Sequence, residues 1–150
     1  MIYWFTGQPA QGKSILSGKL WRYLNNNYPK TRHFVIDGDE IRNLLDNKDY
    51  SEQGRRTNMK VAQGIASYLN DKHFGVLVAL VSPYRDLRED FKSRWGNQIR
   101  EIYIHSNRKT ERDKYRVSNY QKPLDNYISI DTSQDSVEES FKKLKKELKL

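Results

Sequence analysis

The segment Gly7-Gln8-Pro9-Ala10-Gln11-Gly12-Lys13-Ser14 has the pattern G-x-x-x-x-G-K-S. This spacing is typical of a loop that binds the phosphates of a nucleoside triphosphate. Its two glycines allow the backbone to approach a phosphate closely, with N–H groups pointing inward. Lys13 can reach the β- and γ-phosphates, and the Ser14 hydroxyl is suited to ligate Mg²⁺. We therefore predict that all eight residues bind nucleotide, that Lys13 also takes part in catalysis, and that Ser14 belongs to a metal site.

The residues on either side of this loop supply the structural context that such a loop requires. Residues 2–6 form a β-rich apolar run, and apolar residues recur after the loop at helical spacing, as at Leu16, Leu20 and Leu24. Strand, loop and helix in this order confirm the motif. They disfavour the alternative that the segment is only a glycine-rich turn between two core elements.

The composition of the chain limits the classes to which it can belong. With 150 residues we predict one domain over 1–150. No apolar run approaches the roughly eighteen residues of a membrane span, and there are no cysteines for disulfides or thiolate metal sites. The first apolar run leads directly into the loop, so we expect no secretory signal, no membrane association and a cytoplasmic location. The net charge of +8 fits an anionic ligand (nucleotide, sulfate or nucleic acid) but also fits solubility alone.

Strand and helix patterns alternate along the whole chain. Strands are predicted over 2–6, 33–37, 75–82, 99–105 and 127–131. Helices are predicted over about 13–27, 38–45, 52–72, 84–95 and 109–116, followed by a last helix that Asp135 or Ser136 caps. The continuous apolar run 75–82 predicts a central strand buried on both faces. The alternation predicts a three-layer α/β fold of the P-loop NTPase type, with a five-stranded parallel sheet and helices on both faces.

A carboxylate-rich turn, Asp37-Gly38-Asp39, follows the second predicted strand. In parallel sheets ligands bind beyond the carboxyl ends of the strands, where the phosphate loop also lies. One carboxylate of such a pair can support a metal-bound water while the other takes the proton of an attacking hydroxyl. We predict Asp39 as the catalytic base and Asp37 as a residue that supports the metal and the substrate. The alternative is a capped turn, for which Asp-Gly is also suited.

A basic cluster lies on predicted helices near the same edge of the sheet. Arg42 comes one helical turn after Asp39, and Arg55 and Asn58 are three residues apart on one helix face. Arginine side chains suit phosphate or sulfate oxygens, so we predict that these three residues bind substrate. The alternative is solvated helix charge, which carries more weight for Arg56 than for Arg55.

Four motifs in this order resemble those of the adenylylsulfate kinase family, and the likeness covers most of the chain. They are G-x-x-x-x-G-K-S, Asp37-Gly38-Asp39-x-x-Arg42, Tyr50-Ser51-Glu52-x-x-Arg55-x-x-Asn58 and Ser82-Pro83-Tyr84-Arg85. The resemblance implies phosphorylation of the ribose 3′-hydroxyl of adenosine 5′-phosphosulfate by ATP with Mg²⁺. It matches Asp39 to the base, Arg42, Arg55 and Asn58 to residues that hold the phosphosulfate, and Ser82 and Pro83 to the substrate-side loop. For the last two, strand termination by proline is an alternative that needs no ligand.

The later part of the chain resembles the same family less completely. The strand-end loop that contains Thr132 corresponds to one near the adenine of ATP, and Arg112 in Arg112-Asp113-Lys114-Tyr115 resembles the start of the family's lid. We therefore predict that both residues bind nucleotide. The resemblance also suggests a homodimer, although it marks no interface.

The main departure from the family is a shortened lid. Residues 117–126 are too few for the family's longer loop, and its Thr-Gly-Ile-Asp-like stretch is missing. This leaves the acceptor open: adenosine 5′-phosphosulfate comes first, and the alternatives are another nucleotide, a sugar or a hydroxymethyl base in DNA. A further alternative, a function other than that of a kinase, is a nucleotide-dependent switch that hydrolyses ATP slowly. Residues 108–122 carry six basic and two acidic groups, so they could cover a phosphorylated acceptor or contact a nucleic acid backbone.

Overall fold

Five parallel strands form one sheet through the middle of the structure. The computed structural model describes residues 1–150, and its strands are β1 (Ile2–Thr6), β2 (His33–Asp37), β3 (Gly75–Ala79), β4 (Ile99–His105) and β5 (Tyr127–Asp131). Their order across the sheet is β2-β3-β1-β4-β5, and every neighbouring pair is parallel. All carboxyl ends therefore lie at one edge, and the phosphate loop follows the central strand.

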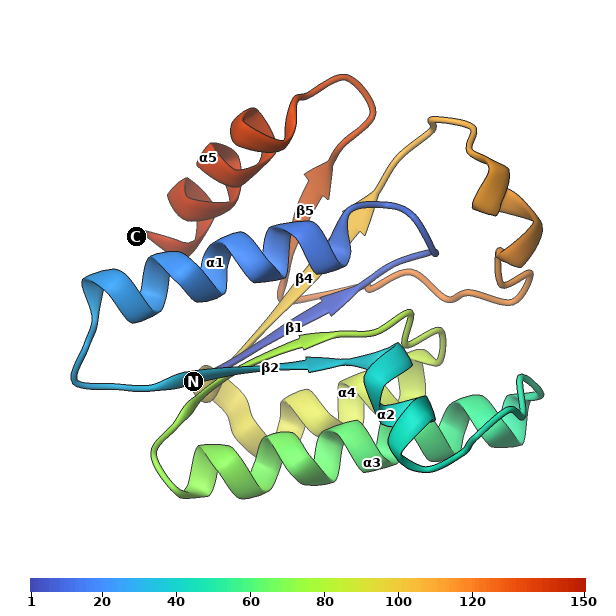
Figure 1. Ribbon diagram of the computed structural model, residues 1–150, viewed down its shortest axis with the longest axis horizontal. Helices are drawn as coiled ribbons and strands as arrows, with labels where there is room; N and C mark the ends of the chain where they lie inside the picture. The colour runs from blue at the N-terminus through green and yellow to red at the C-terminus, as the bar shows by residue number, and fades with distance from the viewer.

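Helices cover both faces of this sheet (Figure 1). On one face lie α1 (Lys13–Asn27) and α5 (Val137–Leu148), and on the other lie α2 (Gly38–Leu44), α3 (Glu52–Asp71) and α4 (Arg85–Trp95). Two short 3₁₀ helices, η1 (Gly96–Gln98) and η2 (Glu111–Tyr115), complete the structure. No helix here has the length and apolar character that crossing a membrane requires. The predicted three-layer α/β fold with a five-stranded parallel sheet is confirmed.

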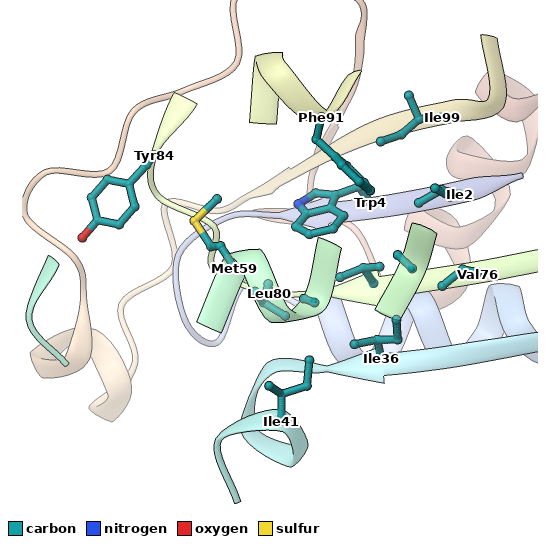
Figure 2. Close-up of a cluster of buried hydrophobic side chains, with 13 residues drawn as sticks. Ile2, Trp4, Ile36, Ile41, Met59, Val76, Leu80, Tyr84, Phe91 and Ile99 are labelled. Atoms are coloured by element: carbon teal, nitrogen blue, oxygen red, sulfur yellow. The ribbon is translucent and has the colours of Figure 1, made fainter. Parts of the chain in front are cut away.

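The core consists of one apolar cluster on each face of the sheet, because side chains alternate along each strand. Ile2 and Trp4 of β1 belong to the cluster under α3 and α4, whereas Tyr3 and Phe5 belong to the cluster under α1 and α5. Trp4 packs edge-on against Phe91 of α4, with ring centroids 5.3 Å apart (Figure 2). The two clusters hold β1 between the helical layers and so fix the start of the phosphate loop.

Serine residues cap the N-terminal ends of two helices, as the sequence predicts. Ser51 accepts a hydrogen bond from the N–H of Gly54 at the start of α3. Ser136, rather than Asp135, caps α5 and forms a reciprocal pair of hydrogen bonds with Glu139. Each cap satisfies N–H groups that the first helical turn leaves free.

The structure corrects three details of the predicted elements. β3 ends at Ala79 rather than at residue 82, because the chain leaves the sheet toward Ser82, whose φ is 48°. The centre of the sheet is β1, and β3 lies beside it, although both faces of β3 are buried. The predicted helix over 109–116 is only the 3₁₀ helix η2, none of whose residues is buried. A helix this short is not stable without an apolar face to pack.

Candidate active site

The phosphate loop connects β1 to α1 and is shaped by two glycines. Gly7 and Gly12 have φ values of 148° and 101°, which residues with a side chain rarely adopt. A Cβ atom at Gly7 would lie 2.1 Å from the carbonyl oxygen of Ile104, so only glycine fits there. Gly12 precedes α1 and makes no side-chain cap, which leaves the first N–H groups of the helix available to an anion.

Lys13 is the buried cation of this loop. It is 8% exposed, and its Nζ donates a 2.7 Å hydrogen bond to the carbonyl oxygen of Gln8. Burial lowers the pKa of Lys13 to about 8, while the charge of Asp37 acts in the opposite direction. A buried ammonium group gains most from a charged hydrogen-bond acceptor, and phosphate oxygens are such acceptors.

Nucleotide binding should therefore depend on pH through Lys13. If the charged ammonium form binds phosphate as predicted, nucleotide affinity should fall above pH 8, by up to about tenfold per pH unit. Binding measured by calorimetry from pH 7 to 10 would show this decline in the native chain. In Lys13→Arg, whose guanidinium stays charged, weaker but pH-independent binding is expected over the same range. The same decline in the arginine variant would assign the pH dependence to another group.

The lowered pKa also has a consequence for stability. In the unfolded chain this lysine has its ordinary pKa of 10.5, against about 8 in the folded protein. Between these two values the unfolded chain binds more protons than the folded one. Folding stability attributable to Lys13 therefore rises as the pH increases from 8 to 10.5.

The carboxylate of Asp37 joins the phosphate loop to α2. Its Oδ2 accepts a 3.0 Å hydrogen bond from the Ser14 hydroxyl, and its Oδ1 accepts a 2.9 Å bond from the N–H of Asp39. The second bond caps α2, so the capped turn that we considered as an alternative exists beside the predicted carboxylate pair. Asp39 is exposed in the first turn of α2 and lines the same cavity as Ser14 and Asp37.

The oxygens of Ser14 and Asp37 fit the chemistry of Mg²⁺. They lie 3.0 Å apart and line one cavity, and Mg²⁺ prefers oxygen ligands. The chain offers no group of three or more His, Cys, Asp or Glu residues that could hold a metal. Phosphate oxygens and water would have to supply the other ligands, which is how Mg²⁺ is commonly held beside a nucleotide.

A second set of cationic groups surrounds Tyr50. The Arg42 guanidinium lies 4.1 Å from the centre of the Tyr50 ring and donates hydrogen bonds to the carbonyl oxygens of Asn47 and Asp49, at 3.1 and 2.9 Å. The Arg55 guanidinium lies 5.5 Å from the same ring and donates to the Tyr50 carbonyl oxygen at 2.9 Å. A guanidinium has five N–H donors, so both arginines retain donors for an anion in the cavity.

Asn58 contributes a buried acceptor to the same wall. It is 5% exposed, its Nδ2 donates a 3.4 Å hydrogen bond to the carbonyl oxygen of Gly38, and its Oδ1 has no hydrogen-bond partner. Leaving such an oxygen unpaired costs about 1–3 kcal/mol. A ligand that donates a hydrogen bond to Asn58 would remove this cost.

One cavity of about 820 Å³ brings most of the predicted site residues together. Those that line it are Pro9, Ala10, Lys13, Ser14, Asp37, Asp39, Arg42, Arg55, Asn58, Ser82, Pro83 and Arg112. Those that lie outside its lining are Gly7, Gln8, Gln11, Gly12 and Thr132. Phosphate-binding and acceptor-binding candidates thus face one space, while the role of each residue stays a prediction.

Ser82 and Thr132, two further predicted site residues, also make contacts within the protein. Ser82 is 1% exposed, and its Oγ accepts a 3.1 Å hydrogen bond from Trp4 Nε1 while its carbonyl oxygen accepts one from Arg88. The Thr132 hydroxyl donates a 3.0 Å hydrogen bond to the carbonyl oxygen of Gln11. Thr132 therefore supports the phosphate loop from the end of β5, and a direct contact of either hydroxyl with a ligand stays a prediction.

Several residues that sequence analysis did not assign to the site also line the cavity. They include Asn43, Tyr50, Lys114, Tyr115 and Arg116, besides apolar residues such as Met59 and Leu80. No motif marked Asn43, whereas Tyr50 belongs to the third motif and Lys114, Tyr115 and Arg116 belong to the basic segment 108–122. Composition therefore carried a signal for them, but only the folded chain shows that they face the phosphate loop.

Comparison with known proteins assigns the chain to a family. A family model described as adenylylsulphate kinase matches residues 1–143. The chain belongs to the adenylylsulphate kinase family. The matched range includes every residue that lines the cavity, and the resemblance inferred from the four motifs is confirmed.

Relatives in the adenylylsulphate kinase family match this chain to different extents. An adenylyl-sulfate kinase of Burkholderia ambifaria is 35% identical over 97 residues, which are 63% of this chain and 52% of the relative. The match thus spans about half the length of that relative. The APS kinase of Mycobacterium tuberculosis, solved in complex with AMPPNP and APS, is 22% identical, with a TM-score of 0.81 and coverage of 99% of this chain and 97% of that one.

The fold of the adenylylsulphate kinase family also occurs in a protein that is named a gluconokinase. A gluconokinase of Sinorhizobium meliloti is 11% identical, with a TM-score of 0.70 and coverage of 94% of this chain and 87% of that one. At such identities the solved structures show the shared fold alone. The acceptor must be inferred from the cavity and the family.

Proposed function

We propose that this chain transfers the γ-phosphoryl group of ATP to the 3′-hydroxyl of adenosine 5′-phosphosulfate. The observation that carries the proposal is that the cavity of the phosphate loop also holds a second set of polar groups, two guanidinium groups and an unpaired amide oxygen. Lys13 and Ser14 belong to the loop, whereas Arg42, Arg55 and Asn58 line the same space from α2 and α3. A nucleotide-dependent switch would need no second set. Membership of the adenylylsulphate kinase family supports the choice of acceptor.

In the proposed reaction the phosphate loop holds ATP, the second set of groups holds the acceptor, and Asp39 acts on the acceptor hydroxyl. Lys13 and the N–H groups of the phosphate loop hold the β- and γ-phosphates. Asp39 accepts the proton of the acceptor hydroxyl, whose oxygen bonds to the γ-phosphorus as the bond to the β–γ bridging oxygen breaks. Ser14 and Asp37 would hold Mg²⁺, which neutralises phosphate charge when it is bound. The protein contributes mainly position and charge neutralisation.

The acceptor side suits a ligand with several negative charges. Arg42 and Arg55 retain free N–H donors and flank the ring of Tyr50, and the Asn58 oxygen has no partner in the protein. Phosphate and sulfate oxygens match the first two groups, and a hydroxyl or amino group of the acceptor matches the third. An uncharged sugar, one of the alternative acceptors from the sequence analysis, would offer no anionic group to either arginine.

The proposal is tested by following phosphate transfer from labelled ATP with Mg²⁺, with adenosine 5′-phosphosulfate present or omitted. We expect a 3′-phosphorylated product only when the acceptor is present. Arg55→Gln should raise the KM for the acceptor about tenfold or more, because hydrogen bonds to charged groups contribute about 1.5–3 kcal/mol. The KM for ATP should change little.

The matched control is Arg56→Gln in the same turn of α3. Arg56 is paired with Glu52 and Asp86 and does not line the cavity, so neither KM should change. Nucleotide binding without transfer to this acceptor would overturn the proposed substrate. The next acceptors to try would be nucleosides, sugars and DNA with hydroxymethyl bases. The homodimer and the cytoplasmic location stay predictions.

A further inference from the structure

We propose that the side chain of Gln8 is a positioning group that holds a basic arm beside the phosphate loop. The basic arm is residues 109–116, which contain η2 and contribute Arg112, Lys114, Tyr115 and Arg116 to the cavity. The effect on catalysis rests on the proposed function. The attachment of the arm does not, and it can be measured separately.

Gln8 is bound to the chain at the end of the arm by two hydrogen bonds. Its Nε2 donates to the carbonyl oxygen of Val117 at 2.7 Å, and its Oε1 accepts from the N–H of Val117 at 2.8 Å. Val117 is 6% exposed, so these bonds satisfy backbone groups that burial removes from water. An amide side chain carries its donor and its acceptor on two atoms of one planar group, so it can pair with the C=O and the N–H of the same residue. The phosphate-loop motif itself does not specify the residue at this position.

No residue of the basic arm itself forms a hydrogen bond to the rest of the protein. The hydrogen bonds of residues 109–116 run within the arm, chiefly between Thr110 and Asp113. No residue of η2 is buried. At its start the arm follows Arg108, which donates to the carbonyl oxygens of Ser133 and Asp135. Gln8 therefore supplies the attachment at the other end.

The chain beyond Val117 is fixed independently, so the attachment by Gln8 acts on the arm. The Tyr120 hydroxyl is hydrogen-bonded to the Thr6 hydroxyl at 2.8 Å. The N–H of Gln121 donates to the carbonyl oxygen of Pro83 at 2.9 Å. These contacts hold residues 120–121 to β1 and to the Ser82–Pro83 loop, and they leave the arm as the part whose position depends on Gln8.

The position of the arm matters because Arg112 lies within electrostatic reach of the loop. Arg112 and Lys13 line the same cavity. A cation held here can interact with the phosphates that Lys13 binds. Loss of the Gln8 bonds would leave Arg112 in the protein but no longer in a fixed position.

Limited trypsin digestion tests the attachment without any assay of activity. We compare the native chain with Gln8→Leu, which keeps the size of the side chain and removes both bonds, and with Gln8→Glu, which removes the donor. We expect cleavage after the arginine and lysine residues of the arm to become about tenfold faster in Gln8→Leu, with a smaller increase in Gln8→Glu. The control is Gln53→Leu on α3, because Gln53 is exposed and bonds only to Thr57. Equal arm cleavage in Gln8→Leu, Gln8→Glu and the native chain overturns the proposal, whatever the transfer activity.

Kinetics test the consequence for catalysis. We expect Gln8→Leu to lower kcat about tenfold while the KM for ATP changes less than about threefold, because the loss is one of alignment. In an Arg112→Ala background, Gln8→Leu should have no further effect on kcat, since the two residues act through one interaction. Additive effects of the two substitutions would overturn the positioning role. Absence of transfer by the native chain would overturn the proposed function instead, and the digestion would still decide on the arm.

Discussion

Asp39→Asn is expected to lower kcat by about 10²- to 10⁴-fold, because asparagine keeps the shape of the side chain but cannot accept the proton of the acceptor hydroxyl. Nucleotide affinity should be retained, since Lys13 is unchanged and Asp37 keeps its bonds to Ser14 and to the N–H of residue 39. Single-turnover transfer and equilibrium binding of nucleotide measure the two quantities separately.

Glu40→Gln is the matched control for this substitution. Glu40 follows Asp39 in the first turn of α2, is exposed, and does not line the cavity. The control removes the same charge from the same helix turn, so kcat should change less than about twofold. An equal loss of kcat in both variants would mean that the negative charge at the start of α2 matters, and that Asp39 does not act as a base. Retained kcat in Asp39→Asn would overturn the assignment of Asp39.

Glu101→Gln is expected to have the largest effect on stability, about 3–5 kcal/mol of unfolding free energy, because it leaves a buried guanidinium without its counter-charge. The Glu101 and Arg88 side chains are each 1% exposed, and their charged atoms lie 2.7 Å apart. Lys92 Nζ lies 2.5 Å from the other carboxylate oxygen. Thermal unfolding should show a midpoint about 10 °C lower or more.

Glu89→Gln serves as the comparison for this change. Glu89 pairs with the same Lys92 at 2.9 Å, but its side chain is 42% exposed. Exposed ion pairs contribute little, so we expect a loss of at most about 1 kcal/mol. Similar unfolding midpoints for Glu101→Gln and Glu89→Gln would show that losing the buried charge of Glu101 costs no more stability than losing the exposed charge of Glu89. Because Arg88 also donates to the carbonyl oxygens of Ser82 and Gln121, Glu101→Gln should disturb the Ser82–Pro83 loop as well.

Patterns close together in the sequence determined much of this protein. The spacing of Gly7, Gly12, Lys13 and Ser14 identified the phosphate loop, because this mode of phosphate binding requires these residue types within one short loop. Alternating strands and helices predicted the layers, and the turn Asp37-Gly38-Asp39 was placed correctly at the carboxyl end of a strand. Each of these inferences depends on local periodicity or on a short motif, which the chain carries whatever its distant contacts.

The prediction failed in two segments whose structure depends on how they pack rather than on their local pattern. The charge-rich segment 109–116 has helical residues but no apolar face, and it folds only as η2. The apolar run 75–82 continues past the end of its strand because Leu80 is needed in the core, while the chain already turns toward Ser82. Composition cannot separate a buried strand residue from a buried loop residue.

Only the tertiary structure decided which distant residues meet. The Gln8 side chain binds Val117 across 109 positions of sequence, and the Arg88–Glu101 pair depends on α4 packing over β4. Strand order and register set these contacts, because they fix which loops lie side by side at the carboxyl edge of the sheet. The sequence supplied the groups that we propose to bind phosphate, and the order β2-β3-β1-β4-β5 placed the basic arm, Arg42 and Arg55 around one cavity.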